Sequence, residues 1–130
     1  MEKIKFKNIK KSYDNINYVL DNINFEIEEG DFVTIIGESG GGKTTLLKLI
    51  AGLEKASTGE IFIDGEYANY MTPKERKVSF IFQDFALYPS MTVFENIIFP
   101  LKEEKIPYDK ACELTWEIIK KMNLEVIQAR

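Results

Sequence analysis

A glycine-rich segment between Gly37 and Thr44 carries the residue types that bind phosphate groups. The spacing of a phosphate-binding loop is met by Gly37, Gly42, Lys43 and Thr44. Glycines let successive backbone N–H groups point inward, and the positive end of the following helix adds to their attraction for phosphate oxygens. Lys43 supplies a mobile charge for the terminal phosphates, and the Thr44 hydroxyl is a hard oxygen ligand for Mg²⁺. The segment therefore predicts a nucleotide site.

Such a loop must join a buried strand to a helix. Residues 32–36 are nearly all apolar and β-branched, which predicts a strand buried on both faces of a parallel sheet. Residues 45–53 are apolar on almost every side of a helix, which predicts a buried helix. This context favours a phosphate loop over the alternative, a glycine-rich turn without a ligand.

The remaining β-structure is predicted at both ends of this core. Residues 3–7 and 23–28 alternate between charged or polar and apolar side chains, which indicates two antiparallel strands that share one solvated face, and a turn follows at 29–31. The alternating lysines of the first strand are interpreted as this solvated face rather than as a binding patch. Residues 60–65 predict a short strand and a turn, and residues 78–82 a second buried strand.

From residue 92 the pattern becomes helical. Thr92 and Glu95 have the spacing of a capping box, and Pro100 is expected to end or kink the helix that they begin. A second helix is predicted after Pro107, with Asn123 as its stop. Its predicted buried stripe consists of Ala111, Leu114, Ile118 and Met122. The order of elements indicates an α/β protein.

Composition excludes several other classes of function. The net charge of −4 argues against a nucleic-acid-binding protein, which usually carries a basic stripe. The chain has one cysteine, Cys112, and no histidine, so an internal disulfide and histidine-based metal sites or general bases are excluded. The N-terminus lacks the apolar stretch of a signal peptide, and the apolar runs are too short to span a bilayer. If the protein acts at a membrane, it must therefore do so through a partner.

Three motifs in sequence order resemble those of ABC transporter ATP-binding subunits. They are the loop and helix at 37–53, the Ser57–Gly65 hairpin, and the segment from Phe82 to Ile97, which is similar to the Q-loop and is closest to importers of sugars and related solutes. The resemblance implies a P-loop NTPase with a RecA-like core and an antiparallel β-subdomain in residues 1–91. Residues 92–130 would begin the helical subdomain.

The resemblance also implies roles for single residues. Tyr13 would stack on adenine, with Tyr18 as a weaker candidate, and Gln83 would contact Mg²⁺ and the attacking water. Lys43 and Gln83 are thus the expected catalytic residues, and Thr44 and Gln83 the expected metal ligands. The expected nucleotide contacts are Tyr13, Ser39, Gly40, Gly41, Gly42, Lys43, Thr44 and Thr45. Residues 86–89 would lie near the surface that contacts the membrane partner, unless Leu87 and Tyr88 pack into the core instead.

The implied cofactors are ATP and Mg²⁺. The implied partners are transmembrane permease subunits and a second ATP-binding subunit, and no nucleic acid. The protein would be cytoplasmic, on the inner face of the membrane.

The chain lacks the family's signature sequence, the Walker B strand with its Asp-Glu end, and the switch histidine. We therefore expect a fragment that binds nucleotide weakly at most and does not hydrolyse it. A naturally short, non-hydrolysing nucleotide-binding or pairing module is the alternative. A small-molecule kinase or GTPase would need a lid or base-recognition motif that is not found, and an ABC protein of translation or DNA repair fits the transporter-like 92–97 segment less well.

Overall fold

A computed structural model describes all residues, 1–130, and divides the chain into two compact units, Met1–Phe80 and Ile81–Arg130. Each unit is described by itself. None of its helices combines the length and the apolar character that a membrane span requires.

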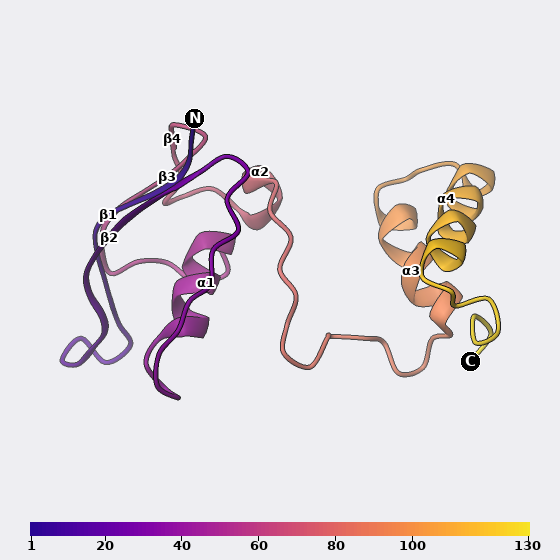
Figure 1. Ribbon diagram of the computed structural model, residues 1–130, viewed down its shortest axis with the longest axis horizontal. Coiled ribbons are helices and arrows are strands. Elements are labelled where there is room, and N and C mark those ends of the chain that lie inside the picture. The colour runs from indigo at the N-terminus through magenta and orange to yellow at the C-terminus, as the bar shows by residue number, and fades with distance from the viewer. The chain divides into compact units, whose positions relative to one another are not determined.

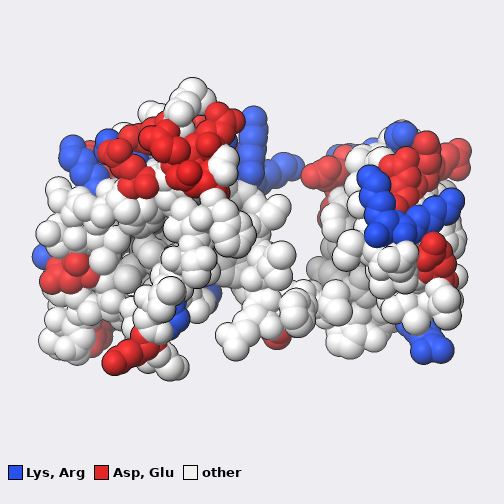
Figure 2. All heavy atoms as spheres, viewed as in Figure 1, with Lys and Arg blue, Asp and Glu red and all other residues white.

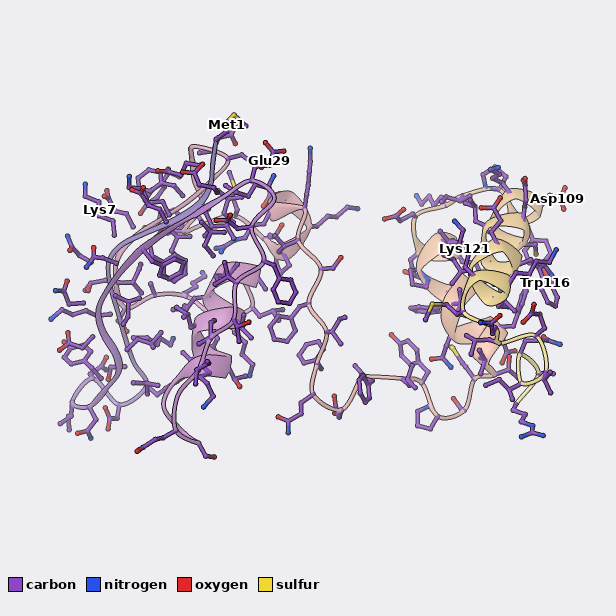
Figure 3. The ribbon with its side chains drawn as sticks, viewed as in Figure 1. Met1, Lys7, Glu29, Asp109, Trp116 and Lys121 are labelled. Carbon is purple, nitrogen blue, oxygen red and sulfur yellow. The ribbon has the colours of Figure 1, made fainter.

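The first unit is built on an antiparallel sheet with the strand order β2-β1-β3-β4 (Figure 1). The predicted outer strands are present as β1 (Glu2–Ser12) and β2 (Tyr18–Glu28), which pair with each other. Phe6 lies opposite Phe25 in this pair, and their rings stack with centroids 4.6 Å apart. The predicted hairpin consists of β3 (Thr58–Ile63) and the short β4 (Glu66–Tyr67). At the end of the β1–β2 ladder, the Glu29 N–H donates to the Met1 carbonyl at 2.9 Å, and both residues are labelled in Figure 3.

The two faces of this sheet differ in polarity. The lysines of β1 form ion pairs with acidic neighbours, as expected of a solvated face, and charges of both signs lie side by side in Figure 2. The opposite face is covered by α1 (Lys43–Ala51), whose Leu49 is fully buried. The resulting core contains Phe6, Ile9, Leu20, Leu49, Ile61, Ile63 and Ala68.

Both predicted buried strands are absent. Residues 31–38 and 78–82 form no strand, and the side chains of Phe32 and Ile36 are 97% and 91% exposed. A strand buried on both faces needs hydrogen-bonded neighbours and packed layers, and the described sheet pairs only β1 to β4. The prediction that α1 is buried all round is also wrong, because Leu47 and Leu53 are exposed and only Leu49 and Ala51 are buried.

The second unit is a helical pair, α3 (Val93–Glu103) and α4 (Tyr108–Lys121). The predicted capping box is confirmed, since the Thr92 N–H donates to Glu95 Oε2 at 2.7 Å and the Glu95 N–H to Thr92 Oγ1 at 3.2 Å. Pro100 does not end α3. It lies in the last turn, where its own carbonyl still accepts from the Glu104 N–H at 3.1 Å.

The buried stripe of α4 differs from the predicted one. Ala111 is buried as predicted, but Ile118 and Met122 are exposed, and Thr115 and Ile119 take the buried positions. The apolar pattern missed Thr115 because a hydroxyl is polar, whereas here it donates to the Ala111 carbonyl at 2.8 Å and is satisfied within the helix. The stop at Asn123 is confirmed by its left-handed φ of 55° after the end of α4.

Arg76 is a buried cation in the first unit, at the end of the short helix α2 (Pro73–Arg76). Its guanidinium donates to the carbonyls of Leu49 at 2.6 Å and Ile50 at 3.0 Å, which belong to the last turn of α1. It also donates to the carbonyls of Ala68 at 2.7 Å and Met71 at 3.1 Å. Burial lowers the pKa of the guanidinium, but arginine stays charged at any ordinary pH. Arg76 therefore ties α1 to the chain that follows β4.

We predict that Arg76→Met lowers the free energy of unfolding by about 2–4 kcal/mol, because four carbonyls lose a charged donor at once. Urea denaturation followed by circular dichroism measures the change. Lys74→Met is the matched control, since Lys74 is exposed on the same helix and its loss should cost less than about 0.5 kcal/mol. Equal losses for the two variants would contradict the structural role of Arg76.

Candidate functional site

The predicted phosphate loop leads directly into α1 (Figure 1). Residues 37–41 are exposed, and the Gly41 N–H donates to the Glu38 carbonyl at 3.1 Å, which closes a turn. Ser39 and Gly40 lie at the tip of this turn, and Thr44 is exposed in the first turn of α1. The loop is therefore open to a ligand from solvent.

The N-terminal end of α1 lacks the side-chain groups that usually cap a helix. No side chain caps it, and no acidic residue lies in its first turn. The first N–H groups of a helix have no partner within the helix, and together with the helix dipole they attract anions. An anion at this position would satisfy them, so the residues present fit a phosphate group.

Lys43 lies over the loop. Its ammonium donates to the carbonyl of Gly37 at 2.8 Å and to the carbonyl of Glu38. Both acceptors are neutral backbone groups at the protein surface, and no carboxylate holds the ammonium. A lysine held this way can exchange the carbonyls for phosphate oxygens, because an ammonium binds an anionic oxygen more strongly than a neutral carbonyl.

Gly42 lies where the loop meets α1 and packs against the sheet, and it has a left-handed φ of 88°. A Cβ atom at this position would lie 2.9 Å from Leu20 Cδ2 and 3.0 Å from the Val19 carbonyl oxygen. The backbone of the loop thus sits directly against β2, and this close approach fixes where the helix begins.

Tyr13 lies beside the first turn of α1. Its hydroxyl is 3.3 Å from Thr45 Oγ1, and its side chain is 58% exposed. The first unit thus places the exposed ring of Tyr13, one of the predicted nucleotide contacts, next to the phosphate loop. Tyr18, the weaker candidate for that role, begins β2 and has the ammonium of Lys10 5.1 Å above its ring centroid.

Asp14 holds the segment that carries Tyr13, and the sequence motifs did not single it out. One of its carboxylate oxygens accepts from the N–H groups of Ile16 at 2.8 Å and Asn17 at 2.7 Å, and from the Ser12 hydroxyl at 3.0 Å. The Asn17 side chain donates to the other oxygen at 2.8 Å. The signal was present, because aspartate and asparagine at this spacing favour a turn closed by side-chain to backbone bonds.

Gln83 lies in the second unit, where it begins an exposed turn that ends at Ala86. Of the segment 86–89, Leu87 is exposed, and the Tyr88 ring packs on Phe99 with centroids 4.9 Å apart. Asn96 holds this segment by accepting from the Tyr88 N–H at 2.9 Å and donating to the Met91 carbonyl at 3.1 Å. Leu87 therefore does not pack into the core, which was the alternative interpretation.

Known proteins resemble this chain over most of its length. A family model described as ABC transporter matches residues 20–130. The sn-glycerol-3-phosphate import ATP-binding protein UgpC of Bordetella avium is 45% identical over 107 residues, which are 82% of this chain and 30% of that protein. Its counterpart from Bartonella bacilliformis is 42% identical over 125 residues, 96% of this chain and 36% of that protein. The chain thus spans about a third of the length of these relatives.

Solved structures agree with these matches. Two dimeric structures of the ATP-binding cassette MJ0796, one of them bound to ADP and Pi, share 34% and 35% sequence identity with the chain. Their TM-scores are 0.81 and 0.82, and each comparison covers 98% of this chain and 60% of that chain. The fold class expected from the motifs is thereby confirmed.

We predict that Gly42→Ala costs about 2–4 kcal/mol of unfolding free energy, because the added Cβ is both strained and crowded. Gly40→Ala is the matched control. Gly40 has a similar φ of 79°, but a Cβ atom added there would have nothing within 4 Å, so only about 1 kcal/mol of backbone strain is expected. Urea denaturation of both variants measures the difference, and a Gly40 loss as large as that of Gly42 would contradict the close approach to β2.

A second prediction concerns pH. Hydrogen bonds, first from the Asn17 N–H and next from the Ile16 N–H, hold the pKa of the Asp14 carboxyl far below its ordinary value. Because the folded pKa is depressed, the stabilisation is present above the ordinary pKa of about 3.9 and is lost only as the pH falls toward the folded value. The amide chemical shifts of Ile16 and Asn17 should therefore stay constant from neutral pH down to about pH 3.

Nuclear magnetic resonance titration of the chain measures these shifts, and Asp14→Asn identifies the signals that depend on the carboxylate. If the chemical shifts of both amides change with a midpoint near the ordinary pKa of aspartate, the carboxylate does not hold the segment.

Proposed function

The chain belongs to the ABC transporter family, and on this basis we propose that it binds MgATP at the loop from Gly37 to Thr44 as part of an ATP-binding subunit. The observation that carries the proposal is the uncapped N-terminal end of α1 with the Lys43 ammonium held above it by loop carbonyls. In its whole form, such a subunit couples ATP binding and hydrolysis to the transport of a solute.

The chain's own residues would bind the phosphates in two ways. The N–H groups from Ser39 to Thr45 would donate to phosphate oxygens, for which the Gly41 N–H must leave the Glu38 carbonyl, and the helix dipole favours the negative charge. Lys43 leaves the carbonyls of Gly37 and Glu38 and donates to the terminal phosphates instead. Both interactions grow with the number of phosphate charges, so they favour a triphosphate over a monophosphate.

Mg²⁺ bound here would neutralise phosphate charge during transfer to water. No group of three or more His, Cys, Asp or Glu side chains in the chain is placed to hold a metal ion. Hard oxygen ligands suit Mg²⁺, which is commonly held by a few protein oxygens together with phosphates and water. We therefore propose the Thr44 hydroxyl as its ligand in the first unit. The role of Gln83 as a second Mg²⁺ ligand that orients the attacking water stays a prediction from the motif resemblance. The Tyr13 ring would stack on the adenine base.

The relatives' names support an importer. Both are import ATP-binding proteins for sn-glycerol-3-phosphate. Because import requires a path through the membrane and no helix of this chain has the length and apolar character of a membrane span, we propose a role at the inner face of the membrane through a permease partner. The dimeric structures of a similar cassette support pairing with a second ATP-binding subunit. Exposed residues 86–89 are the proposed contact with the permease.

We infer that this chain does not hydrolyse ATP by itself. It contains no histidine, and Asp64 and Asp84 are followed by Gly65 and Phe85 rather than by a glutamate that would act as general base. Binding without turnover is also what the alternative, a non-hydrolysing nucleotide-binding module, would show.

The test is an NMR titration of the purified chain with MgATP, followed at the amide signals of the loop. Saturable binding is expected, and Lys43→Ala should weaken it at least about tenfold, since a charge-assisted contact to phosphate is lost. Lys48→Ala is the matched control, because Lys48 lies in the last turn of the same helix. Phosphate release should remain at the Lys43→Ala background in all variants.

Two outcomes would contradict the proposal. Absence of saturable MgATP binding would overturn the assignment of the loop. Phosphate release by the wild-type chain that is lost in Lys43→Ala would show that the chain is an enzyme by itself.

A further inference from the structure

We propose that Lys11 is a positioning residue for nucleotide recognition, because it fixes the Tyr13 ring as a platform for the base. The inference rests on the proposed function, in which Tyr13 stacks on adenine. It concerns the affinity for the base and not the affinity for the phosphates.

The Lys11 ammonium is held from three sides near the end of β1. It lies 3.2 Å from Glu54 Oε2 and donates to the Lys55 carbonyl at 2.8 Å. It also lies 4.7 Å from the centroid of the Tyr13 ring, within the range of a cation–π interaction. The Lys11 side chain is only 12% exposed, so the ammonium is immobilised between the chain after α1 and the ring.

The Tyr13 ring is constrained at two points. Lys11 occupies one side of the ring, and the hydroxyl meets Thr45 Oγ1 in the first turn of α1. Asp14 fixes the backbone on which the ring stands. A ring ordered in advance binds a flat partner with a smaller loss of conformational entropy. More than half of the side chain stays accessible, which leaves surface for a base.

A second lysine–tyrosine pair, whose lysine also lies on β1, provides the comparison. The Lys10 ammonium lies 5.1 Å from the Tyr18 ring centroid and pairs with Asp21 at 2.9 Å. The Lys10 side chain is 39% exposed, and it lies on the solvated face of the sheet. This pair has the same chemistry as the first, but no hydrogen bond joins Tyr18 to the phosphate loop.

The experiment compares two ligands that differ by the nucleoside. NMR titrations of wild type, Lys11→Met and Lys10→Met give the dissociation constants for MgATP and for Mg-tripolyphosphate. Lys11→Met should weaken MgATP binding about three- to tenfold, the range expected for a lost cation–π contact and a less ordered ring, and change tripolyphosphate binding less than about twofold. Lys10→Met should change neither dissociation constant. Lys11→Arg should bind MgATP about as tightly as the wild type, because a guanidinium also stacks on a ring.

The outcomes separate this inference from the proposed function. If the wild type binds MgATP and Lys11→Met binds it equally well, or loses both ligands in parallel, the inference is wrong and the nucleotide site stands. If the wild type binds tripolyphosphate and MgATP with equal affinity, the stacking of adenine on Tyr13 is wrong, and the inference falls with it.

If Lys11→Met does not fold, a measurement on the wild type and Tyr13→Leu still tests the inference. The ε-methylene protons of Lys11 should be shifted upfield by the Tyr13 ring and return to ordinary positions in Tyr13→Leu. Ordinary positions in the wild type would overturn the inference.

Discussion

The buried contact between Arg76 and the end of α1 fixes the helix on which the candidate site depends. The last carbonyls of a helix need partners, and here the guanidinium supplies donors to Leu49 and Ile50 while it also binds the chain after β4. The same helix is anchored to the sheet by Leu49. Because this end is closed by the protein itself, the open end of the helix is held at a defined place beside β2.

The two units treat the N-terminal end of a helix in opposite ways. In α3, Thr92 and Glu95 form a capping box, and the N–H groups of Val93 and Phe94 donate at 2.9 Å to the carbonyls of Arg130 and Gln128. Nothing at that end is left for a ligand. In α1, no side chain caps the end, because the N-cap residue is Gly42. An uncapped helix end would let even an acidic chain bind an anion, because the attraction is local and comes from backbone groups.

Much of the fold could be predicted because its signals are local. Alternation marked β1 and β2, a capping box marked the start of α3, and an asparagine marked the end of α4. The predictions that failed concern burial. Phe32 and Ile36 have the composition of an internal strand, but burial depends on neighbours that a residue pattern does not contain. The stripe of α4 failed for a related reason, since Thr115 is buried only because its hydroxyl bonds within the helix.

For the site, the candidate loop follows from the amino-acid sequence alone, because the spacing of glycine, lysine and threonine is the one that predicts a phosphate-binding backbone. Motif resemblance also indicated Tyr13, but its surroundings became known only from the folded chain. Thr45 and Lys11 come from different elements, and folding brings both to the Tyr13 ring. Pairwise contacts between distant segments depend on how strands and helices pack, so they follow from the folded chain and not from the order of its residues.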